Sequence, residues 1–533
     1  MNSHTKKNNG VSNKKNKTDE SISLGSKASK SFASTNTLYP IINSKKANKN
    51  NKKDGKITLL NKQYPDTTIP NIPLSTTTNM LPNIYCDSTG SGEFSKQIEK
   101  TLENNVYNWY SNLHSNSDRG TYMAELVNQS RDIIRESIHA TPDYSLFLIG
   151  SGMTSVMPLI INFLGFQHQT KTDCKIQRKC NCENTLSEYI IIVSDIEHYS
   201  NFLIWQNLID DKDNDIPAFV AKTKLGVIDE NDVYSIIDKY KNKKIIASFT
   251  ACSNVLGTKQ PVEKLAKYIR SLDGIIFVDF SASAPYVDIN VQLFNGIMFS
   301  VHKFLGCAPI GVLCIEDKSV IKNTYPLYPG GSTVEFACSK YHVFHDEPER
   351  KEGGTPNIIG IIKAGLCFVL KNRNMEYIKL RELEIVNLVD KRMEMLSIKY
   401  PKQFICLTPI DNKNKLPIYS LQFPGYHYNI IVKLLNDLFG INTRGGVSCT
   451  FYGEVLLGIK YKPDIIPKFG WVRVSFIYYM KNDVIEYVLN SIEYLISNIQ
   501  NHIGDYLYDE STNKWEKKDN TKQIKFMKLK DMI

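Results

Sequence analysis

The sequence predicts an α/β protein with a mostly parallel sheet, followed by a smaller α+β region toward the C-terminus. Apolar, β-branched runs alternate with helical stretches through the middle of the chain, which is the pattern of a parallel sheet with crossover helices. After about residue 341 the pattern changes to a long helical stretch, then strands, then a helix. Polar residues follow the strand-like runs, where parallel sheets bind ligands.

Order is expected to begin near Leu81, because residues 1–80 are rich in Lys, Asn, Ser and Thr and lack an apolar period. The segment NIYCDSTG then predicts a short strand and turn, and residues 122–139 predict a helix. The six sheet strands are expected at Leu146–Ile149, Tyr189–Val193, Lys244–Phe249, Ile275–Val278, Gly296–Phe299 and Gly311–Ile315.

The C-terminal half predicts fewer and longer elements. One helical pattern runs over residues 357–395, strands are expected at 417–423 and 471–476, and a helix at 483–499. From Gly504 the chain is polar and charged, which suggests a loose tail. The predicted organisation is therefore a tail (1–80), a large domain (81–335), a small domain (336–503) and a second tail (504–533).

The net charge of +10 comes from the first 80 residues, which hold 14 Lys and 4 acidic residues; the other 453 carry 51 basic and 51 acidic. Such an arm can contact nucleic acid or an anionic surface, although a solvated, disordered arm is the simpler interpretation. Eleven cysteines without a regular framework, and an N-terminus without an apolar signal region, predict a reducing, cytoplasmic setting.

Two segments invite other interpretations. Residues 144–168 contain no Asp, Glu, Lys or Arg, but Gly, Ser, Thr, Pro and Asn interrupt them, so we expect a buried strand, turn and helix and no membrane span. Cys174, Cys180 and Cys182 lie in a polar insertion that could bind zinc. Their spacing lacks a second Cys pair and a nearby His, so a surface insertion and no metal site are predicted.

Four polar signals follow predicted strands. Lys303 comes just after a buried strand, where desolvation favours the neutral amine that forms imines. Asp279 can pair with the pyridinium nitrogen of an aromatic cofactor, or cap a turn. His198 can stack on a flat ring, or pack in a loop. The turn Gly150–Thr154 opens a helix and offers N–H groups to an anion.

The order of these motifs resembles the class V aminotransferase family, which includes the cysteine desulfurases, over roughly residues 85–496. Each motif alone is common, but their ordered succession is specific. The segments that carry the resemblance are YCDSTGSG, GSGMTS, EHYSNFLIW, SNVLGTKQPV, VDFSASAPYVDI, FSVHKFLG, PGGSTV, EGGTPN, TRGGVSC and VRVSF.

This resemblance implies the type I fold of enzymes that use pyridoxal 5′-phosphate (PLP), with Lys303 holding PLP as a Schiff base and moving the substrate α-proton. His198 would stack on the ring, and Arg473, with Arg444, would bind the substrate carboxylate. Thr333 would complete the phosphate site of a partner subunit, which implies a homodimer. The residues implied to contact PLP are Gly152, Met153, Thr154, His198, Asn254, Asp279, Ser300, His302, Lys303 and Thr333.

Cys449 lies five positions after Arg444, a spacing similar to that of the sulfur-accepting cysteine in one group of desulfurases. Its other interpretation is a small buried residue in a Gly-rich turn. The chain departs from the family pattern in having Ala282 where desulfurases usually have Gln, in a shorter link from there to Lys303, in Met153 for a smaller residue, and in Tyr199 for a second His.

Three functions remain open from the sequence. The first is a PLP enzyme acting on an amino acid, as a cysteine desulfurase or related lyase that passes sulfur to an acceptor protein. The second is an aminotransferase, which shares the first chemical step at Lys303. The third is a non-catalytic scaffold on the same fold, disfavoured because the expected Lys, Asp, His and Arg are all present.

Overall fold

The computed structural model describes residues 81–166, 188–209, 218–346, 348–450, 452–457, 469–519 and 529, within one compact unit. Cys174, Cys180 and Cys182 lie outside the described residues. At the centre is a seven-stranded sheet in the order β2-β10-β9-β8-β7-β3-β4, in which only β10 runs antiparallel to its neighbours. Its strands are β2 (Tyr144–Ile149), β3 (Tyr189–Ser194), β4 (Ala218–Ala221), β7 (Lys244–Thr250), β8 (Ile275–Asp279), β9 (Gly296–Ser300) and β10 (Gly311–Glu316).

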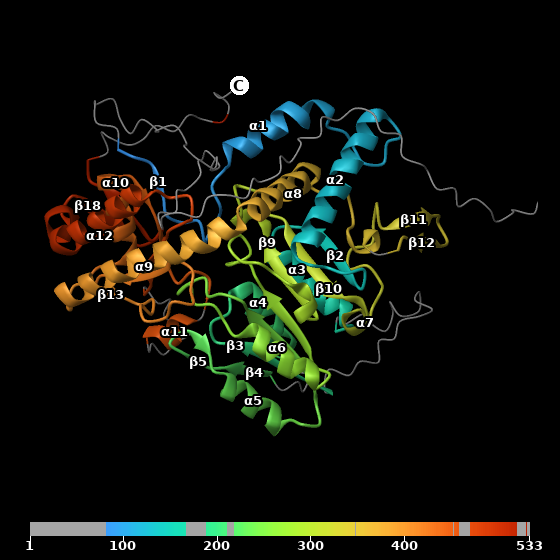
Figure 1. Ribbon diagram of the computed structural model, residues 1–533, viewed down its shortest axis with the longest axis horizontal. Helices are drawn as coiled ribbons and strands as arrows, with labels where there is room; N and C mark the ends of the chain where they lie inside the picture. The colour runs from blue at the N-terminus through green and yellow to red at the C-terminus, as the bar shows by residue number, and fades with distance from the viewer. Residues whose placement is uncertain are drawn as a thin grey trace, which may run out of the picture. The chain divides into compact units, whose positions relative to one another are not determined.

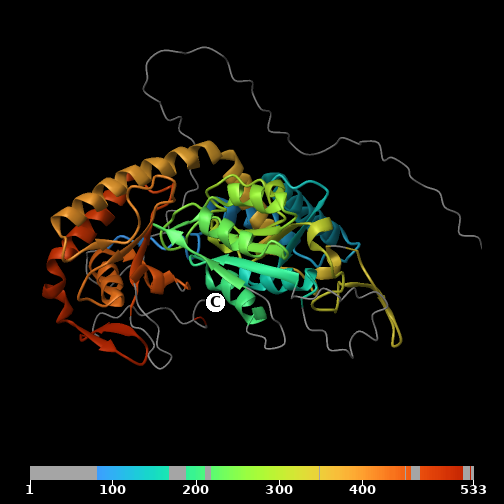
Figure 2. The ribbon, with the colours of Figure 1, turned by 90° about the horizontal axis from the view of Figure 1, so that it is seen from below.

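All six strands predicted for the sheet are confirmed. These segments form strands because their side chains supply apolar surface to both faces of the sheet. Along β8, Ile276 and Val278 join one apolar cluster and Phe277 joins another, as the two-residue period of a strand requires. Figures 1 and 2 show helices over both faces of the sheet. The first face is covered by α2 (Asp118–Ser137), α5 (Glu230–Lys239), α6 (Val262–Ser271) and α8 (Ile358–Arg373), the second by α3 (Met153–Phe163) and α4 (Tyr199–Ile209).

A second, four-stranded sheet has the order β13-β14-β17-β16 and its own apolar core. The helical pattern predicted over residues 357–395 is two helices, α8 and α9, because the chain leaves helical geometry at Asn374. The elements here are β13 (Ile405–Cys406), β14 (Ile418–Gln422), β16 (Arg444–Gly446), β17 (Trp471–Ser475), α9 (Met375–Lys399), α10 (Tyr428–Phe439) and α12 (Asn482–Ile503). Figures 1 and 2 show them gathered at one end, in orange to red.

The two ends of the described chain both join this C-terminal core. Strand β1 (Ile84–Tyr85) pairs in parallel with β15 (Ile441–Asn442), and Cys86 is fully buried there. Residues after Gly504 differ from the loose tail that we expected, since β18 (Tyr506–Asp509) and β19 (Lys514–Lys517) form an antiparallel hairpin. Its Tyr506 is buried and Trp515 packs against the same core, and these apolar contacts hold the hairpin in place.

The remaining elements are short or peripheral. Hairpin β11–β12 extends from the body in Figures 1 and 2. These elements are α1 (Lys96–Asn105), α7 (Asp317–Val320), α11 (Tyr452–Leu457), β5 (Thr223–Lys224), β6 (Val227–Ile228), β11 (Val334–Ala337) and β12 (His342–Phe344).

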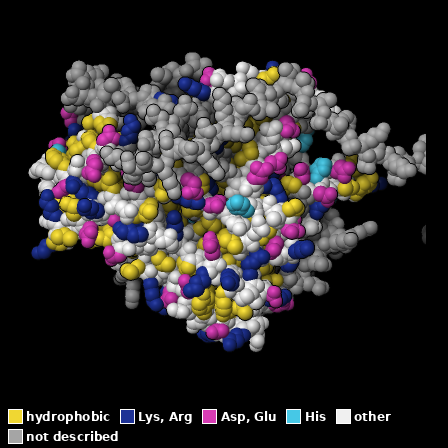
Figure 3. Space-filling view, viewed as in Figure 1, with side chains coloured by type: hydrophobic (Ala, Val, Ile, Leu, Met, Phe, Trp, Pro, Cys, Tyr) yellow, Lys and Arg dark blue, Asp and Glu magenta, His cyan; other side chains and the backbone are white. Residues whose placement is uncertain are grey.

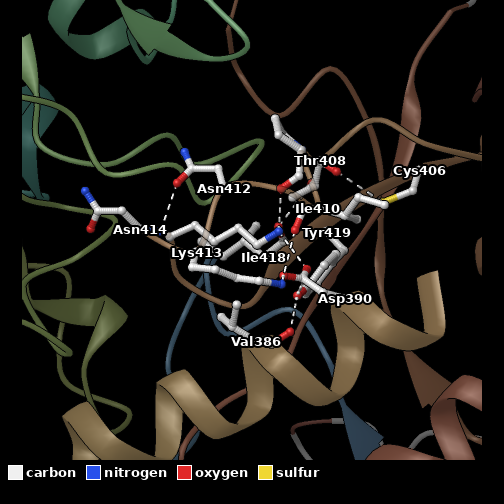
Figure 4. A network of polar contacts seen from close by, with 12 residues as sticks. Val386, Asp390, Cys406, Thr408, Ile410, Asn412, Lys413, Asn414, Ile418 and Tyr419 are labelled. Atoms are coloured by element: carbon white, nitrogen blue, oxygen red, sulfur yellow. Dashed lines mark hydrogen bonds and ion pairs between the residues drawn. The ribbon is translucent and has the colours of Figure 1, made fainter. Parts of the chain in front are cut away.

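An ion network centred on the buried Asp390 links α9 to the loops beside the second sheet (Figure 4). Asp390 accepts from the Tyr419 hydroxyl at 2.8 Å and pairs with Lys413 Nζ at 2.8 Å and Lys415 Nζ at 2.7 Å. The Lys415 side chain has no exposure to solvent. Next to it, Leu416 N–H donates to the Gly257 carbonyl at 2.8 Å, so the network supports the loop that follows β7.

The surface is mixed in charge. On the face seen in Figure 3, Lys and Arg side chains alternate with Asp and Glu over the described residues, in keeping with the equal numbers of the two signs after residue 80. Across the described part of the chain, no helix is both long enough and apolar enough to cross a membrane.

Candidate active site

The predicted site residues meet at one edge of the large sheet. Strands β2, β9, β8, β7 and β3 all end there, because β2 and β9 are each antiparallel to β10 and the others are parallel to β9. Asp279 is the last residue of β8, and Ser300 ends β9. Lys303 follows in a single 3-10 turn, Val301–Lys303. The edge is where a doubly wound sheet binds ligands.

Lys303 and Asp279 form the electrostatic centre of the site. Burial lowers the pKa of Lys303 to about 8, and the Asp279 carboxylate opposes part of that shift. Burial also raises the pKa of Asp279, against the stabilising charge of Lys303 and a 2.8 Å hydrogen bond from Ser281 N–H to Oδ1. A lysine with this pKa is about half neutral amine at pH 8, a far larger share than that of an exposed lysine.

The turn before α3 is an anion cradle. Gly152 has φ +73°, and a Cβ there would lie 2.9 Å from Ser300 Oγ, so the turn requires glycine. Met153 N–H donates to Ser300 Oγ at 2.9 Å, which joins the turn to the Lys303 loop. His302 Nδ1 is buried and has no hydrogen-bond partner among the described residues. Helix N–H groups and hydroxyls are donors that a phosphate needs, and His302 Nδ1 is a further donor when it carries the ring proton.

His198 is held in one orientation and one charge state. Its Nδ1 accepts from Ser200 N–H at 3.1 Å, which places the proton of the neutral ring on Nε2. Burial, aided by the positive charge of Lys303, lowers the pKa of His198 to about 3. The Ser200 hydroxyl also lies 2.7 Å from Thr154 Oγ1, so it joins His198 to the anion cradle.

Cys449 is exposed, and this excludes the alternative of a small buried residue. Ser448 and Cys449 both have positive φ, +56° and +55°, a conformation that non-glycine residues adopt only where the surroundings enforce it. Tyr199 N–H donates to the Cys449 carbonyl at 2.8 Å, and Asn254 Nδ2 donates to the Ser448 carbonyl at 2.8 Å. These bonds, with a β-bridge between His198 and Thr450, hold the loop against His198 and Asn254, two of the predicted site residues.

Arg473 and Arg444 lie on neighbouring strands of the second sheet. Arg473 is buried, and its NH2 group donates to Asp87 Oδ1 at 2.6 Å. Arg444 is half exposed and pairs through Nε with Asp87 Oδ2 at 3.0 Å. Arg473 NH1 also donates to the Asn254 carbonyl at 3.2 Å, which connects the arginine pair to the predicted site.

The structure separates one predicted residue from this cluster and adds three that we did not predict. The Thr333 hydroxyl bonds with the N–H and carbonyl of Gly330, so within one chain its contacts are local. Asp87 and Ser200 lie in motifs that we recognised without assigning them a role. Glu197, fully buried beside His198, accepts from Ser194 Oγ at 2.5 Å, Asn201 Nδ2 at 2.7 Å and Thr250 N–H at 2.9 Å, and anchors the loop.

The residues present fit PLP. The Gly152 turn, Thr154 and His302 Nδ1 offer an anion cradle, and Lys303 is the amine. Asp279 adds a buried carboxylate at the end of β8, the type of group that can pair with a pyridinium nitrogen. Asn254, which the family resemblance implied to contact the cofactor, donates in this structure to the Ser448 carbonyl.

Known proteins are similar to this chain in sequence. Residues 84–488 match the Aminotransferase class-V family. A probable cysteine desulfurase of Borreliella burgdorferi is 24% identical over 427 residues, which is 78% of this chain and 92% of the relative. A cysteine desulfurase of Wigglesworthia glossinidia brevipalpis is 28% identical over 395 residues, 71% of this chain and 86% of the relative.

Solved structures show the same fold. The apo structure of a cysteine desulfurase from Thermococcus onnurineus NA1 superposes with a TM-score of 0.66 at 24% identity, over 78% of this chain and 95% of that one. The sheet order and the family match agree with the type I PLP fold that the motifs predicted. The chain therefore belongs to the class V aminotransferase family, a family of PLP-dependent enzymes.

Proposed function

We propose that this enzyme is a cysteine desulfurase that releases sulfur from L-cysteine and forms alanine, with Cys449 as the sulfur acceptor. The observation that carries the proposal is the position of Cys449, exposed on a loop whose Ser448 carbonyl accepts from the Asn254 side chain, while the Asn254 carbonyl accepts from Arg473. The names of the relatives agree with it. PLP supplies the electron sink that labilises bonds at the substrate α- and β-carbons.

Each residue of the site has a separate role in this reaction. Arg473 and Arg444 bind the substrate carboxylate, and Lys303 Nζ moves the α-proton. Cys449 Sγ, as a thiolate, bonds to the substrate sulfur while the substrate Cβ–S bond breaks. The electron pair of the broken bond stays with the carbon fragment, which takes up protons and leaves as alanine, and the sulfur remains on Cys449 as a persulfide. His198, neutral and protonated at Nε2, would stack on the ring of bound PLP.

The experiment is to incubate the purified enzyme with PLP, L-cysteine and excess dithiothreitol, which reduces the Cys449 persulfide and releases its sulfur as sulfide, and to measure alanine and sulfide. Wild type is expected to form both, and Cys449→Ser is expected to form neither while keeping bound cofactor. Lys303→Ala is expected to lose the lysine adduct that borohydride traps. A keto acid with stoichiometric amino transfer, and no alanine, would assign the enzyme as an aminotransferase. Sulfide release by Cys449→Ser at the wild-type rate would remove Cys449 from the reaction.

The proposal includes a homodimer, a sulfur-accepting protein and a reducing, cytoplasmic setting. The dimer is supported by hairpin β11–β12, which exposes Phe336, Tyr341 and Val343 next to Thr333. An accepting protein is supported by the fixed loop of Cys449, because a persulfide that cannot travel needs a partner thiol to reach it. The described cysteines are free thiols, as a reducing compartment would keep them. Light scattering of the holoenzyme measures the dimer directly.

A further inference from the structure

Arg444 and Arg473, the proposed substrate-binding residues, repel each other because the pairing of their strands places them side by side. Strands β16 and β17 are antiparallel, and their register places Arg444 directly opposite Arg473. Residues opposite each other on paired strands project from the same face, and like charges in that position destabilise a sheet. Burial adds to the cost, since it already lowers the pKa of Arg473. An anion between the two guanidinium groups is therefore required.

Asp87 is that anion, and the fold holds it in place. Its Oδ1 lies 2.6 Å from Arg473 NH2 and its Oδ2 lies 3.0 Å from Arg444 Nε. The residues on each side are tied to the end of β17, because Ser475 N–H donates to the Cys86 carbonyl at 2.8 Å and Thr89 Oγ1 lies 2.7 Å from Ser475 Oγ. Gly90 leaves room, since a Cβ there would lie 2.8 Å from the Asp87 carboxylate.

The three side chains leave one positive charge and one buried N–H donor unpaired in the described part of the chain. Arg473 also donates through NH1 to the Asn254 carbonyl at 3.2 Å, while its Nε is buried and has no partner in the described part of the chain. Arg444 keeps 47% of its side chain exposed. Two guanidinium groups and one carboxylate carry a net charge of +1, which a single substrate carboxylate neutralises.

We propose that Asp87 is a specificity-determining residue, which restricts the arginine pair to amino acids with one carboxylate and disfavours dicarboxylic ones. The proposal rests on the proposed function in one respect, that Arg473 and Arg444 bind the substrate carboxylate. A second carboxylate in the substrate would meet Asp87 with no arginine left to pair with it, and unpaired like charges are a common means of rejecting a competing ligand.

The test uses carboxylates that have neither amine nor sulfur, so their binding is independent of the reaction. Propanoate and succinate are titrated into the holoenzyme and followed by ligand-observed NMR, giving the ratio of their dissociation constants. Asp87→Asn is expected to shift this ratio at least tenfold toward succinate. Arg444→Gln is expected to weaken both ligands, succinate more. The double variant Asp87→Asn/Arg444→Gln, with the net charge of +1 restored, is expected to return to within about threefold of the wild-type ratio.

Two controls separate specificity from structure. Asp238→Asn removes a carboxylate from an exposed pair with Lys241 and is expected to leave the ratio unchanged. Asp87→Asn could weaken the affinity for propanoate and succinate equally, with no recovery of affinity in the double variant. This result would make Asp87 a structural residue only and overturn the proposal. An unchanged ratio would also overturn it. If Asp87→Asn does not fold, Arg444→Gln decides, because succinate must then lose more affinity than propanoate. Absence of sulfide release would refute the desulfurase assignment without changing these ratios.

Discussion

Replacing Asp390 by Asn is expected to be among the most destabilising single changes outside the active site. Asp390 is 3% exposed and pairs at 2.7 Å with Lys415, whose side chain is fully buried. Asn keeps the shape but removes the charge, and so leaves the Lys415 ammonium buried without its counterion. Breaking one side of a buried pair costs about 3–5 kcal/mol of the free energy of unfolding. An exposed pair, Glu376 with Lys379, gives the matched control, and Glu376→Gln is expected to cost about 0.5 kcal/mol or less.

Urea unfolding at pH 7 and pH 9 measures both the loss and its cause. Burial lowers the pKa of Lys415, and Asp390 opposes that shift. Without Asp390, the pKa of Lys415 in the folded protein falls further below its pKa in the unfolded chain. Between these two pKa values the folded protein binds fewer protons than the unfolded chain, so the free energy of unfolding rises with pH. The loss in free energy of unfolding caused by Asp390→Asn should therefore be smaller at pH 9 than at pH 7. A loss under about 1 kcal/mol at pH 7, or a deficit that grows with pH, would refute the reasoning.

Three further predictions concern the active site. Capture of PLP by the apoenzyme should rise with pH through a midpoint near 8, as the neutral Lys303 amine becomes available, and a midpoint near 10 in stopped-flow absorbance would contradict this. Gly152→Ala should weaken PLP binding at least tenfold in equilibrium dialysis, because of the positive φ and the contact with Ser300, whereas Gly504→Ala, in open space, should not. ¹⁵N NMR should show His198 as the Nε2–H tautomer from pH 5 to 9, and a titration near pH 6.5 would exclude its lowered pKa.

Local patterns were enough to predict the large sheet and the residues at its edge. Its strands are apolar on both faces, so each is a continuous run of β-branched residues, and each active-site side chain comes within a few residues of a strand end. Lys303, Asp279 and His198 could therefore be located from the order of the motifs. The break at Asn374 was missed because the helical pattern continues on both sides of it.

Contacts between distant parts of the chain could not be predicted in the same way. Asp87 and Arg473 are 386 residues apart, and nothing in YCDSTG indicates that the chain returns to β17. The hairpin after Gly504 is another case, since Tyr506 and Trp515 are isolated apolar residues in a charged segment whose burial depends on the core they meet. The exposure of Cys449 was also open, because it follows from a pair of positive φ angles and from hydrogen bonds to other loops.

The pairing of β1 with β15 sets the order in which this enzyme can be completed during its synthesis. The large sheet spans residues 144–316, and its strands and cofactor lysine can associate while the ribosome is still adding the rest of the chain. Asp87, however, leaves the ribosome early and must wait for Arg444 and Arg473, which emerge more than 350 residues later. The growing chain therefore acquires its cofactor pocket first and its means of holding a substrate last.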